Sequence, residues 1–466
     1  MALRLLNLQL STRTSTLVVL DAAACVLAMY GAAFLRLNAI GAAGVASVGS
    51  LWIRALVFAG LTLLSLTALG LYQSRAPVPT RAAALRIALA FAFTGLLLAL
   101  LFYAIPPLYL GRGVLGLSVG FGLLLVLALH IALRRPLDRA VPRRALLVLG
   151  AGERAQQLLA YLPAPLLGRT LELRGFMPLG EAAPAADLPA PLLPAQTDLP
   201  ALVASLQIDE IVLAADERRD RLPMDALLEC KLCGVAVTEA LAFIEREARK
   251  VPLALLQPSW IILNSGFSML PLYPLGKRLF DLLMASVLAI AAAPVMLLAA
   301  LAIRLEDGGP VFYAQARVGR HGRIFRIHKF RSMVVDAERR QTPQWASTDD
   351  PRITRTGRVL RKYRIDELPQ LFNVLRGEMS FVGPRPERPE FVEQLAARIP
   401  YYRERHRVLP GITGWAQLNY PYGGCERDAL EKLQYELYYL KHPSLLFDFL
   451  ILLQTVDVVM FGKGAR

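Results

Sequence analysis

The sequence predicts a membrane protein that combines helical and α/β parts, and three observations point to this class. Of the 466 residues, 55% are hydrophobic and only 19% are charged, which is a more apolar balance than that of ordinary soluble chains. Four apolar stretches of spanning length occupy the first third of the chain. A glycine-containing turn between an apolar strand and a helix then indicates a small doubly wound domain. A long disordered chain, a collagen-like chain and a purely soluble enzyme are therefore not expected.

The length allows about three domains, and changes in composition indicate where they divide. Residues 1–140 are expected to form a four-helix transmembrane bundle, because all four apolar stretches fall there. Residues 141–265 are expected to form a Rossmann-like cytoplasmic domain with a doubly wound sheet. Residues 266–466, where the chain becomes basic and rich in turns, are expected to form a mostly helical domain that contains a re-entrant membrane helix.

The first third contains four predicted spans, at roughly 15–35, 47–72, 82–104 and 112–133. Each is near or above the ~20 residues that a bilayer requires. Arg4 precedes the first span, the loop from 37 to 46 has no basic residue, and five arginines follow the fourth span between 134 and 144. Because positively charged flanks stay in the cytoplasm, the N-terminus and everything after residue 134 are predicted to be cytoplasmic.

A fifth apolar run, from Leu279 to Ile303, is interrupted near its middle by Pro294. A straight crossing would place the strongly basic remainder of the chain outside the cell, against the charge rule. Proline removes a backbone donor and bends a helix, and Lys277 and Arg304 flank the run with positive charge on both sides. We therefore expect a re-entrant helix at 279–303 that dips into one leaflet and returns, with a straight fifth span as the alternative.

The last apolar stretch, Leu445–Phe461, is short and contains Asp448 and Asp457. Two carboxylates in so short a stretch favour a packed or interfacial helix over a sixth span.

The middle segment begins with an apolar strand, Ala145–Leu149, and continues into the turn G-A-G-E-R-A at 150–155. Such a turn lets backbone amides approach a phosphate at a helix N-terminus. Two more apolar strands, 210–214 and 234–237, alternate with helical stretches and favour a doubly wound domain. No acidic residue follows at the position that would bind a ribose, so we expect no catalytic use of NAD. Nucleotide binding and a structural or regulatory role both stay open.

The four cysteines give no disulfide framework. Cys230 and Cys233 form a lone C-x-x-C before Gly234, which is typical of a helix end with a glycine cap. A metal or redox pair is the alternative interpretation.

The last part of the chain is strongly basic, and the whole chain carries a formal net charge of +15. Six basic residues lie between Arg317 and Arg331 around a turn with two glycines, which predicts a hairpin, and six more lie in 352–364. Like charges at this density repel one another, so an anionic partner is expected. Membrane lipid headgroups and a phosphorylated substrate fit better than nucleic acid, because no aromatic interleaving or nucleic-acid motif accompanies the charges.

Asp366 and Glu367 lie within this basic region, in the motif D-E-L-P-Q, and a helical stretch follows them up to Gly377. Proline is tolerated in a first turn, so both carboxylates are expected at the positive end of a helix. One carboxylate could attack phosphorus while the other holds Mg²⁺, which prefers one or two carboxylates together with phosphate oxygens. A helix cap with an ion pair is the alternative.

Several local motifs occur in order along the last part of the chain. They are K-F-R-S-M at 329–333, D-P-R-I-T at 350–354, G-R-V-L-R at 357–361, D-E-L-P-Q at 366–370, F-V-G-P-R-P at 381–386 and G-I-T-G-W-A-Q at 411–417. Together they closely resemble the bacterial sugar transferase family, the monotopic polyprenyl-phosphate sugar-1-phosphate transferases, over about 275–466. With the four spans and the Rossmann-like segment, the whole chain resembles the large, exopolysaccharide-initiating branch.

The resemblance implies an enzyme of the bacterial inner membrane with a cytoplasmic active site. It would transfer a sugar-1-phosphate from a UDP-sugar to undecaprenyl phosphate with Mg²⁺ as cofactor. By motif position, Asp366 resembles the nucleophile of a covalent phosphosugar intermediate and Glu367 its acidic partner, both at the metal. Four basic motif positions are expected to face phosphates: Lys329, Arg331, Arg361 and Arg385. The family commonly has Ser-Pro at the membrane break, where this chain has Ala293-Pro294.

Two other functions compete with this interpretation. A membrane-anchored nucleotide-sugar dehydratase or epimerase would need Tyr-x-x-x-Lys on a helix, and Tyr273–Lys277 has that spacing but contains Pro and Gly. A non-enzymatic basic membrane scaffold or nucleic-acid binder would not need the D-E and P-R-P motifs. The motifs do not identify the sugar, since their shared contacts are to phosphate and nucleotide, and the large membrane part leaves room for a homodimer.

Overall fold

A computed structural model of the chain describes residues 12–38, 51–72, 80–109, 111–140, 143–163, 166–168, 170–179, 188–194, 198–216, 222–258, 260, 273–335, 352–420, 423 and 425–461. The predictions for Arg4, for the loop from 37 to 46 beyond Asn38, and for Asp350 and Pro351 lie outside these residues. The chain divides into two compact units, one built on the N-terminal helices and one that holds most of the remaining chain.

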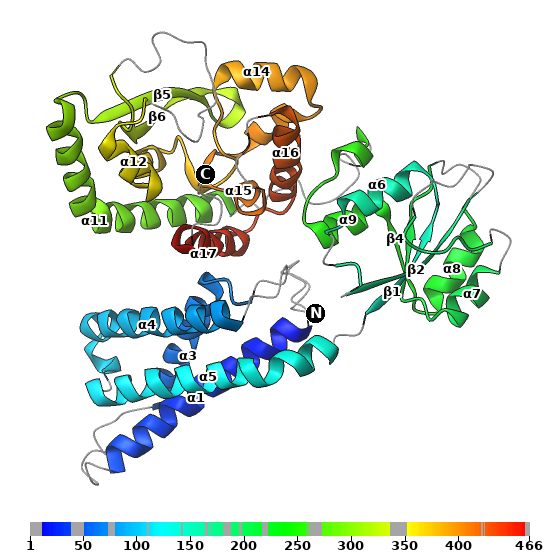
Figure 1. Cartoon of the computed structure of the whole chain (residues 1–466), viewed down its shortest axis with the longest axis horizontal. Coiled ribbons are helices and arrows are strands. Elements are labelled where there is room, and N and C mark those ends of the chain that lie inside the picture. The colour runs from blue at the N-terminus through cyan, green and yellow to red at the C-terminus, as the bar shows by residue number, and fades with distance from the viewer. Residues whose placement is uncertain are drawn as a thin grey trace. The chain divides into compact units, whose positions relative to one another are not determined.

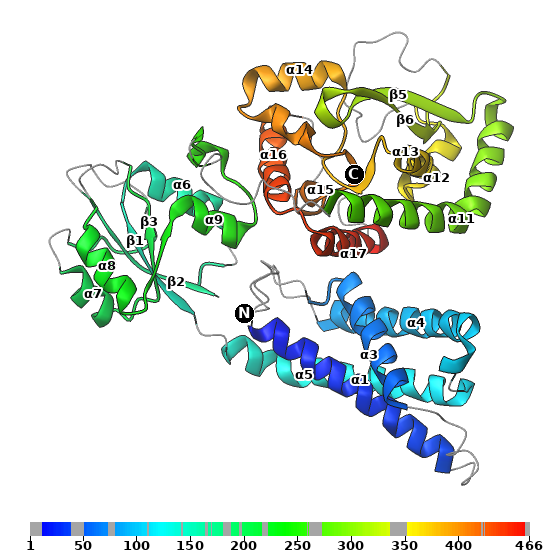
Figure 2. The same ribbon diagram turned by 180° about the vertical axis from the view of Figure 1, so that it is seen from behind.

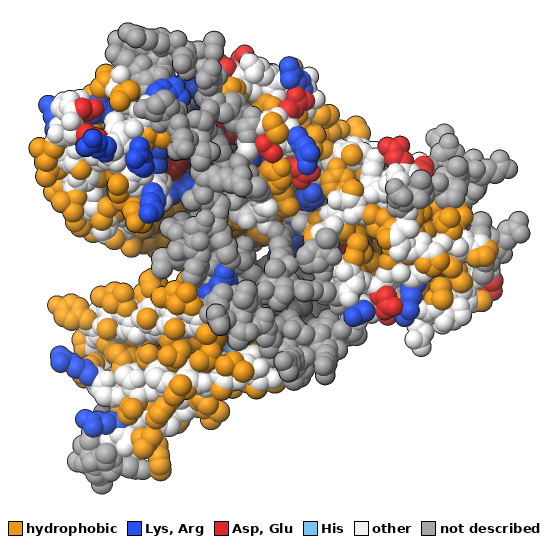
Figure 3. Space-filling model, viewed as in Figure 1, with side chains coloured by type: hydrophobic (Ala, Val, Ile, Leu, Met, Phe, Trp, Pro, Cys, Tyr) orange, Lys and Arg blue, Asp and Glu red, His pale blue; other side chains and the backbone are white. Residues whose placement is uncertain are grey.

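Long apolar helices make up the N-terminal unit (Figure 1). They are α1 (Thr12–Asn38), α3 (Leu51–Ala68), α4 (Thr80–Ala104) and α5 (Arg112–Ala140), with a short 3-10 turn, η2 (Pro106–Leu108), before α5. Each of the four helices is long and apolar enough to cross a membrane. α1 and α4 each pack against α3 and α5. Hydrophobic side chains cover much of the visible surface of this unit (Figure 3), as expected for helices that meet lipid.

A polar cluster is buried among these four helices. Asp21 accepts a hydrogen bond from the Tyr72 hydroxyl at 2.6 Å and contacts His130 Nε2 at 2.9 Å. Arg86 donates to the carbonyl of Gly70 at 3.0 Å. These bonds join α1, α4, α5 and the turn after α3, and polar contacts of this kind fix how apolar helices pack.

The middle of the chain folds around a four-stranded sheet in the order β2-β1-β3-β4. Its strands are β1 (Arg144–Leu149), β2 (Leu171–Met177), β3 (Glu210–Leu213) and β4 (Ala236–Glu239). β3 pairs in parallel with both β1 and β4, so that Glu210 lies opposite Leu146 on one side and Ala236 on the other. The strands predicted from 145 and from 210 are confirmed.

The helices of this region are α6 (Glu153–Tyr161), α7 (Leu199–Ser205), α8 (Met224–Leu232) and α9 (Ala240–Ala248), followed by the turn η3 (Leu253–Leu255). α6 contacts α9 and α7 contacts α8, and the two pairs lie on opposite sides of the sheet (Figures 1 and 2). Gly234 follows α8 with φ of 95°, in the left-handed region that favours glycine. The strand predicted from Gly234 therefore begins at Ala236, and Cys230 and Cys233 are free thiols at the helix end.

The C-terminal part is mostly helical with two short sheets. Its elements are α11 (Tyr273–Asp307), β5 (Phe312–Val318), η4 (Arg320–Gly322), β6 (Ile324–Phe330), α12 (Arg355–Lys362), η5 (Ile365–Glu367), α13 (Gln370–Arg376), β7 (Ser380–Val382), α14 (Pro389–Arg398), η6 (Tyr402–Arg407), β8 (Gly411–Thr413), α15 (Trp415–Asn419), α16 (Glu426–Lys441) and α17 (Leu445–Phe461). β5 and β6 pair antiparallel from Phe312 opposite Phe330 to Val318 opposite Ile324. The predicted hairpin is therefore confirmed.

α11 is one helix that continues through Pro294, so the break expected at this proline is a bend. One stretch of α11 runs beside α17, and the other turns towards β5 (Figures 1 and 2). Ala285, before the bend, belongs to the main hydrophobic core with Val374 and Leu433. Ala299, after the bend, belongs to a second cluster. Proline accounts for the bend because it lacks the N–H of a helical bond and its ring pushes against the preceding turn.

Both ends of α11 are attached to the same part of the chain. Near its start, Arg278 donates to the carbonyls of Val374 at 2.6 Å and Leu375 at 2.8 Å, the last turn of α13. Near its end, Glu306 accepts from the backbone N–H of Arg355 at 2.8 Å, the first residue of α12. The apolar side chains between these anchors are mostly exposed, and Ile290 and Leu297 are 76% and 72% accessible.

α16 provides two ion pairs between the sheet region and the C-terminal part. Lys441 pairs with Glu245 of α9 at 2.7 Å, and both side chains are buried. Lys250 pairs with Glu431 at 3.0 Å.

Candidate active site

Asp366 and Glu367 lie in the 3-10 turn η5, directly before α13. Pro369 is the N-cap of α13, where its missing N–H breaks no helical bond. Gly377 ends the helix with φ of 82°. The carboxylates are thus at the N-terminal end of a short helix, as the sequence predicted, although they precede its first turn.

Asn373 fixes this turn against the hairpin. Its side chain is fully buried, accepts from the backbone N–H of His328 at 3.0 Å, and donates to the carbonyl of Arg326 at 2.8 Å. An amide that replaces strand partners in this way locks α13 to the edge of β6. Lys329, the next residue along β6, consequently reaches Glu367.

Glu367 is surrounded by cationic side chains. Its Oε1 lies 3.0 Å from Lys329 Nζ and 2.9 Å from the Arg385 guanidinium, and its Oε2 lies 3.9 Å from that of Arg364. Burial by itself raises the pKa of Glu367, but Lys329, Arg385 and Arg364 outweigh burial and hold the pKa far below its ordinary value. These three cations therefore favour the ionised form of Glu367.

Asp366 has a different environment, although it is the adjacent residue. It is 8% exposed, and its pKa is raised by burial and by the charge of Glu367, against the opposing effect of Lys329, Arg361 and Arg385. None of the residues that the structure describes donates a hydrogen bond to its carboxylate. A partly desolvated carboxylate without fixed donors is more nucleophilic than a fully paired one.

Arg361 reaches the site from α12. Thr354 caps this helix by accepting from the N–H of Gly357 at 2.9 Å. Gly357 is needed there because a Cβ would come within 2.1 Å of the carbonyl oxygen of Ser332. This close approach lets Arg361 Nε donate to the Ser332 hydroxyl at 3.0 Å.

Arg331 differs from the other predicted phosphate-binding residues. Its side chain is 7% exposed and pairs with Asp307 at the end of α11. Lys329, Arg361 and Arg385 act on the two carboxylates, whereas Arg331 holds the α11 end against the hairpin. The bend of α11 brings this aspartate beside the strand, and the local motif does not show it.

The predicted Mg²⁺ site can be tested against the surroundings of the two carboxylates. Glu367 is a poor metal ligand, because Lys329 and Arg385 already occupy Oε1. The Asp366 carboxylate fits Mg²⁺ better, since the described part of the chain places no donor on it. In that same part, no cluster of three or more His, Cys, Asp or Glu side chains is suited to a metal. Phosphate oxygens and water would then complete a Mg²⁺ shell, as this ion prefers.

The glycine-rich turn of the sheet region is a second candidate anion site. Gly152 is the N-cap of α6, and the Asp216 carboxylate accepts from the backbone N–H of Arg154 at 2.8 Å. A Cβ on Gly152 would lie 1.8 Å from Asp216 Oδ2. The chain's own carboxylate therefore occupies the place where a nucleotide phosphate binds in turns of this type.

The Tyr-x-x-x-Lys spacing also has another use. The Tyr273 hydroxyl and Lys277 Nζ both contact Asp448 Oδ2, at 3.0 and 2.9 Å. They attach α11 to α17, a role that accounts for both side chains.

Two residues near the site were missed by sequence reasoning. Arg364 stands two positions before Asp366 in the basic run and adopts a left-handed backbone with φ of 56°, so only its closeness in sequence could have indicated its contact with Glu367. Arg405 is buried and donates to the backbone carbonyl of Arg385 at 2.9 Å. No sequence pattern shows such a contact.

Comparison with known proteins agrees with this site. Residues 272–462 match the family model described as bacterial sugar transferase. The chain is 47% identical over 196 residues to an Aeromonas hydrophila UDP-N-acetylgalactosamine-undecaprenyl-phosphate N-acetylgalactosaminephosphotransferase, covering 42% of this chain and 46% of the relative. It is 44% identical over 193 residues to a Caulobacter vibrioides UDP-glucose:undecaprenyl-phosphate glucose-1-phosphate transferase, covering 41% and 72%. It is 35% identical over 209 residues to the exopolysaccharide production protein ExoY of Sinorhizobium fredii, covering 42% and 90%.

The fold and the site define a membrane-associated protein with a carboxylate pair in a cationic site suited to phosphate groups. The chain belongs to the bacterial sugar transferase family. The match spans about half the length, or less, of the larger relatives, 46% of the Aeromonas protein and 45% of an Escherichia coli UDP-glucose:undecaprenyl-phosphate glucose-1-phosphate transferase. The family model's match, residues 272–462, includes Asp366 and Glu367.

Proposed function

We propose that this protein transfers a sugar-1-phosphate from a UDP-sugar to undecaprenyl phosphate, giving undecaprenyl-diphospho-sugar and UMP. Such a reaction is the first membrane step in making exopolysaccharide, capsule or O-antigen. The observation that carries the proposal is the difference between two adjacent carboxylates. Asp366 is 8% exposed and receives no hydrogen bond from the described residues, whereas Glu367 contacts Lys329 at 3.0 Å and Arg385 at 2.9 Å. The names and identities of the relatives support the choice of donor and acceptor.

The proposed reaction has two displacements at phosphorus. In the first, an Asp366 oxygen attacks the phosphorus that carries the sugar, the bond from this phosphorus to the UMP oxygen breaks, and UMP leaves with the electron pair. In the second, an oxygen of undecaprenyl phosphate attacks the same phosphorus and the Asp366 oxygen–phosphorus bond breaks, which regenerates the carboxylate. A carboxylate nucleophile divides one difficult transfer into two easier steps.

The cationic side chains have separate tasks in this mechanism. The charges of Lys329 and Arg361 act on Asp366, and in the proposed reaction they would stabilise the charge that develops on the phosphoryl oxygens. Glu367 neutralises part of Lys329 and Arg385 and fixes where they point. Asp366 would hold Mg²⁺, which when bound withdraws charge from the phosphate oxygens.

The proposal also covers the membrane arrangement. α1, α3, α4 and α5 would form a four-span bundle in the bacterial inner membrane, with the Rossmann-like sheet region and the active site in the cytoplasm. α11 would be re-entrant, since Arg278 and Glu306 hold both of its ends to neighbouring helices of one domain while the side chains between them are exposed and apolar. A homodimer remains an expectation from the sequence.

Cysteine labelling tests the re-entrant helix. Single cysteines at positions 274 and 306 should both resist a membrane-impermeant reagent in intact cells and both react after the cells are opened. Replacing Pro294 with Leu should restore a straight apolar helix, move part of the population to a spanning topology and lower transfer. Labelling of position 306 but not 274 in intact cells, in variants that keep Pro294, would contradict the re-entrant arrangement.

The transfer itself is tested by UMP release from a panel of UDP-sugars with undecaprenyl phosphate as acceptor. UDP-glucose, UDP-galactose and their N-acetylated counterparts form the panel. We expect one or two donors to release UMP in a Mg²⁺-dependent reaction that needs Asp366. No release from any of them by folded protein would remove the proposed function.

A further inference from the structure

Residues 384–387, the segment that carries Arg385, are fixed by hydrogen bonds that their backbone carbonyls accept. Four successive carbonyls each accept one hydrogen bond from outside the segment. The Pro384 carbonyl accepts from Gly411 N–H at 2.9 Å, and that of Glu387 accepts from Val318 N–H at 3.0 Å. The two between them accept from arginine side chains.

These two arginines are Arg405 and Arg317. Arg405 donates to the carbonyl of Arg385 at 2.9 Å, and Arg317 donates to that of Pro386 at 3.1 Å. Proline has no N–H, so Pro384 and Pro386 cannot tie the segment through their own amides. The carbonyls are what other groups can hold, and in the middle of the segment they are held by side chains.

Arg405 is itself fixed from behind. Its Nε and one terminal nitrogen bind both oxygens of Glu436 on α16, at 2.8 and 2.7 Å, and the Arg405 and Glu436 side chains are each only 5% exposed. The other terminal nitrogen donates to the Tyr402 hydroxyl at 2.8 Å. A bidentate pair of this type has one geometry and little freedom, so Arg405 presents a fixed donor to Arg385.

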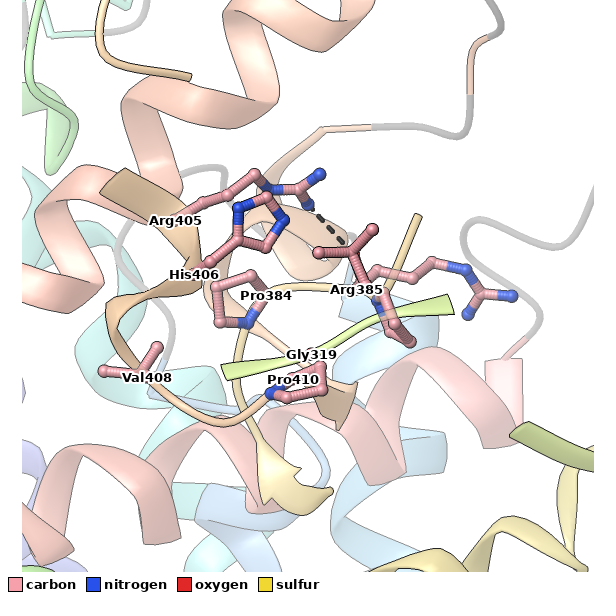
Figure 4. Close-up of a pocket in the computed structure, with 9 residues that line it drawn as sticks. Gly319, Pro384, Arg385, Arg405, His406, Val408 and Pro410 are labelled. Atoms are coloured by element: carbon pink, nitrogen blue, oxygen red, sulfur yellow. Dashed lines mark hydrogen bonds between the residues drawn. The ribbon is translucent and has the colours of Figure 1, made fainter. Parts of the chain in front are cut away.

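The side chain of Arg385 then extends away from this anchor. Arg385 and Arg405 line a small pocket together with Pro384 and His406, and the Arg385 side chain extends away from Arg405 (Figure 4). Its guanidinium ends on Glu367 Oε1, 2.9 Å away. A continuous path of hydrogen bonds and ion pairs thus joins Glu436, Arg405, Arg385 and Glu367.

We propose that Arg405, oriented by Glu436, is a positioning residue that sets the place of Arg385 in the active site through the Arg385 backbone carbonyl. The inference rests on the proposed function and names a part of the machinery outside the carboxylate site. Arg405 touches neither carboxylate by any hydrogen bond or ion pair in the described structure. A lysine in its place keeps one positive charge but cannot bind Glu436 bidentately and also reach the Arg385 carbonyl.

A double-mutant cycle tests this proposal in the full-length protein. The variants are Arg405→Lys, Arg385→Ala and the two combined, each assayed for UMP release from the donor that the wild type uses best. A misplacement of about 1 Å at an active site can cost roughly 100-fold in rate, so we expect Arg405→Lys alone to lower kcat/KM by about 10- to 100-fold. In the Arg385→Ala background the same change should lower kcat/KM by less than about twofold, because its route of action is gone.

Lys441→Met is the matched control. Lys441 lies on the same helix as Glu436 and belongs to another buried ion pair, but its partner is Glu245 of α9. We expect it to lower the melting temperature about as much as Arg405→Lys, while the kcat/KM of folded protein stays within about twofold in both backgrounds. If Arg405→Lys does not fold, Glu436→Gln gives the same cycle, because it leaves Arg405 without its bidentate partner.

Multiplicative effects of Arg405→Lys and Arg385→Ala, like those of two independent sites, would overturn the positioning role while leaving the proposed function intact. The same holds if Lys441→Met lowers kcat/KM as much as Arg405→Lys, because the loss would then follow general stability. A wild type that releases no UMP from any donor would instead overturn the proposed function and this inference with it.

Discussion

Two turns of this molecule place a carboxylate at the start of a helix, and they differ in what they leave available. At the start of α6, Asp216 accepts from the backbone N–H of Arg154 and lies against Gly152. At the start of α13, the carboxylate of Asp366 has no described donor, and Glu367 beside it holds the cations. At the first turn, the carboxylate of Asp216 already accepts a hydrogen bond from the start of the helix. At the second turn, the cationic side chains outnumber the carboxylates.

The excess of positive charge at the second turn follows from the side chains around it. Lys329, Arg361, Arg364 and Arg385 surround two carboxylates, so the formal charge of the group is positive. An incoming phosphate gains from that charge, while at α6 it would have to displace Asp216. A glycine-rich turn alone therefore does not predict an anion site, because a residue 62 positions away can close it.

Asp366→Asn should give the largest effect. An amide cannot attack phosphorus, so UMP release and transfer should fall by roughly 10⁶-fold, comparable to loss of a nucleophile in other covalent enzymes. The matched control is Asp216→Asn, the same change in the other turn, which should keep transfer within about twofold. Equal losses in the two variants would break the distinction between the turns.

Glu367→Gln should give the next largest effect. Removing this anion frees Lys329 and Arg385 to bind Asp366, which ties up the nucleophile. We expect a loss of about 100-fold in kcat, of the size seen when one charge-stabilising group is removed. Measuring kcat as a function of Mg²⁺ concentration tells the loss of a metal ligand from the loss of the anion that holds Lys329 and Arg385. If Asp366 holds the metal, the Mg²⁺ concentration for half activity should change little.

His406 also lies close to positive charge, that of Arg405 and Arg403, and this predicts a smaller effect, on the pH dependence of stability. Burial, together with the charges of Arg405 and Arg403, lowers the pKa of His406 from 6.5 to about 4. Between those two values the unfolded chain binds this proton more readily than the folded one, so stability should fall as pH drops from 6.5 to 4. Melting temperatures measured across this range should fall less in His406→Gln, and equal slopes in both proteins would contradict the assignment.

Asp216→Ala should give the smallest effect on transfer and would sharpen the comparison. It removes the carboxylate from the start of α6 and leaves the amide of Arg154 open. We expect unchanged transfer and a weak gain in binding of ADP or NAD, measured by calorimetry against the wild type. Strong nucleotide binding by the wild type would show that Asp216 does not close the turn.

Much of this site could be predicted from the sequence because its parts are local. Pro369 marks the start of the helix that follows Asp366 and Glu367, and Gly377 marks its end. The hairpin depends on Gly319 and Gly322 between its two strands. Lys329 and Arg385 are predicted from their positions in local motifs, and the structure brings both to Glu367.

The remaining features depend on contacts between distant segments. Arg331 has the same motif setting as Lys329, but the bend of α11 gives it Asp307 as a partner. Arg405 donates to the backbone carbonyl of Arg385, and Asp216, which follows β3, accepts from the N–H of Arg154 at the start of α6. A break was expected at Pro294, whereas packing of both halves of α11 keeps the helix continuous through the bend.

Mass spectrometry of the donor-treated protein tests the central claim most directly. Wild-type protein is incubated with its UDP-sugar without undecaprenyl phosphate, quenched in acid and digested. We expect one sugar-phosphate adduct, on the peptide that contains Asp366, in an amount that matches the UMP released and disappears when undecaprenyl phosphate is added. A stoichiometric burst of UMP without an adduct on Asp366, or with the adduct on Glu367, would contradict the account.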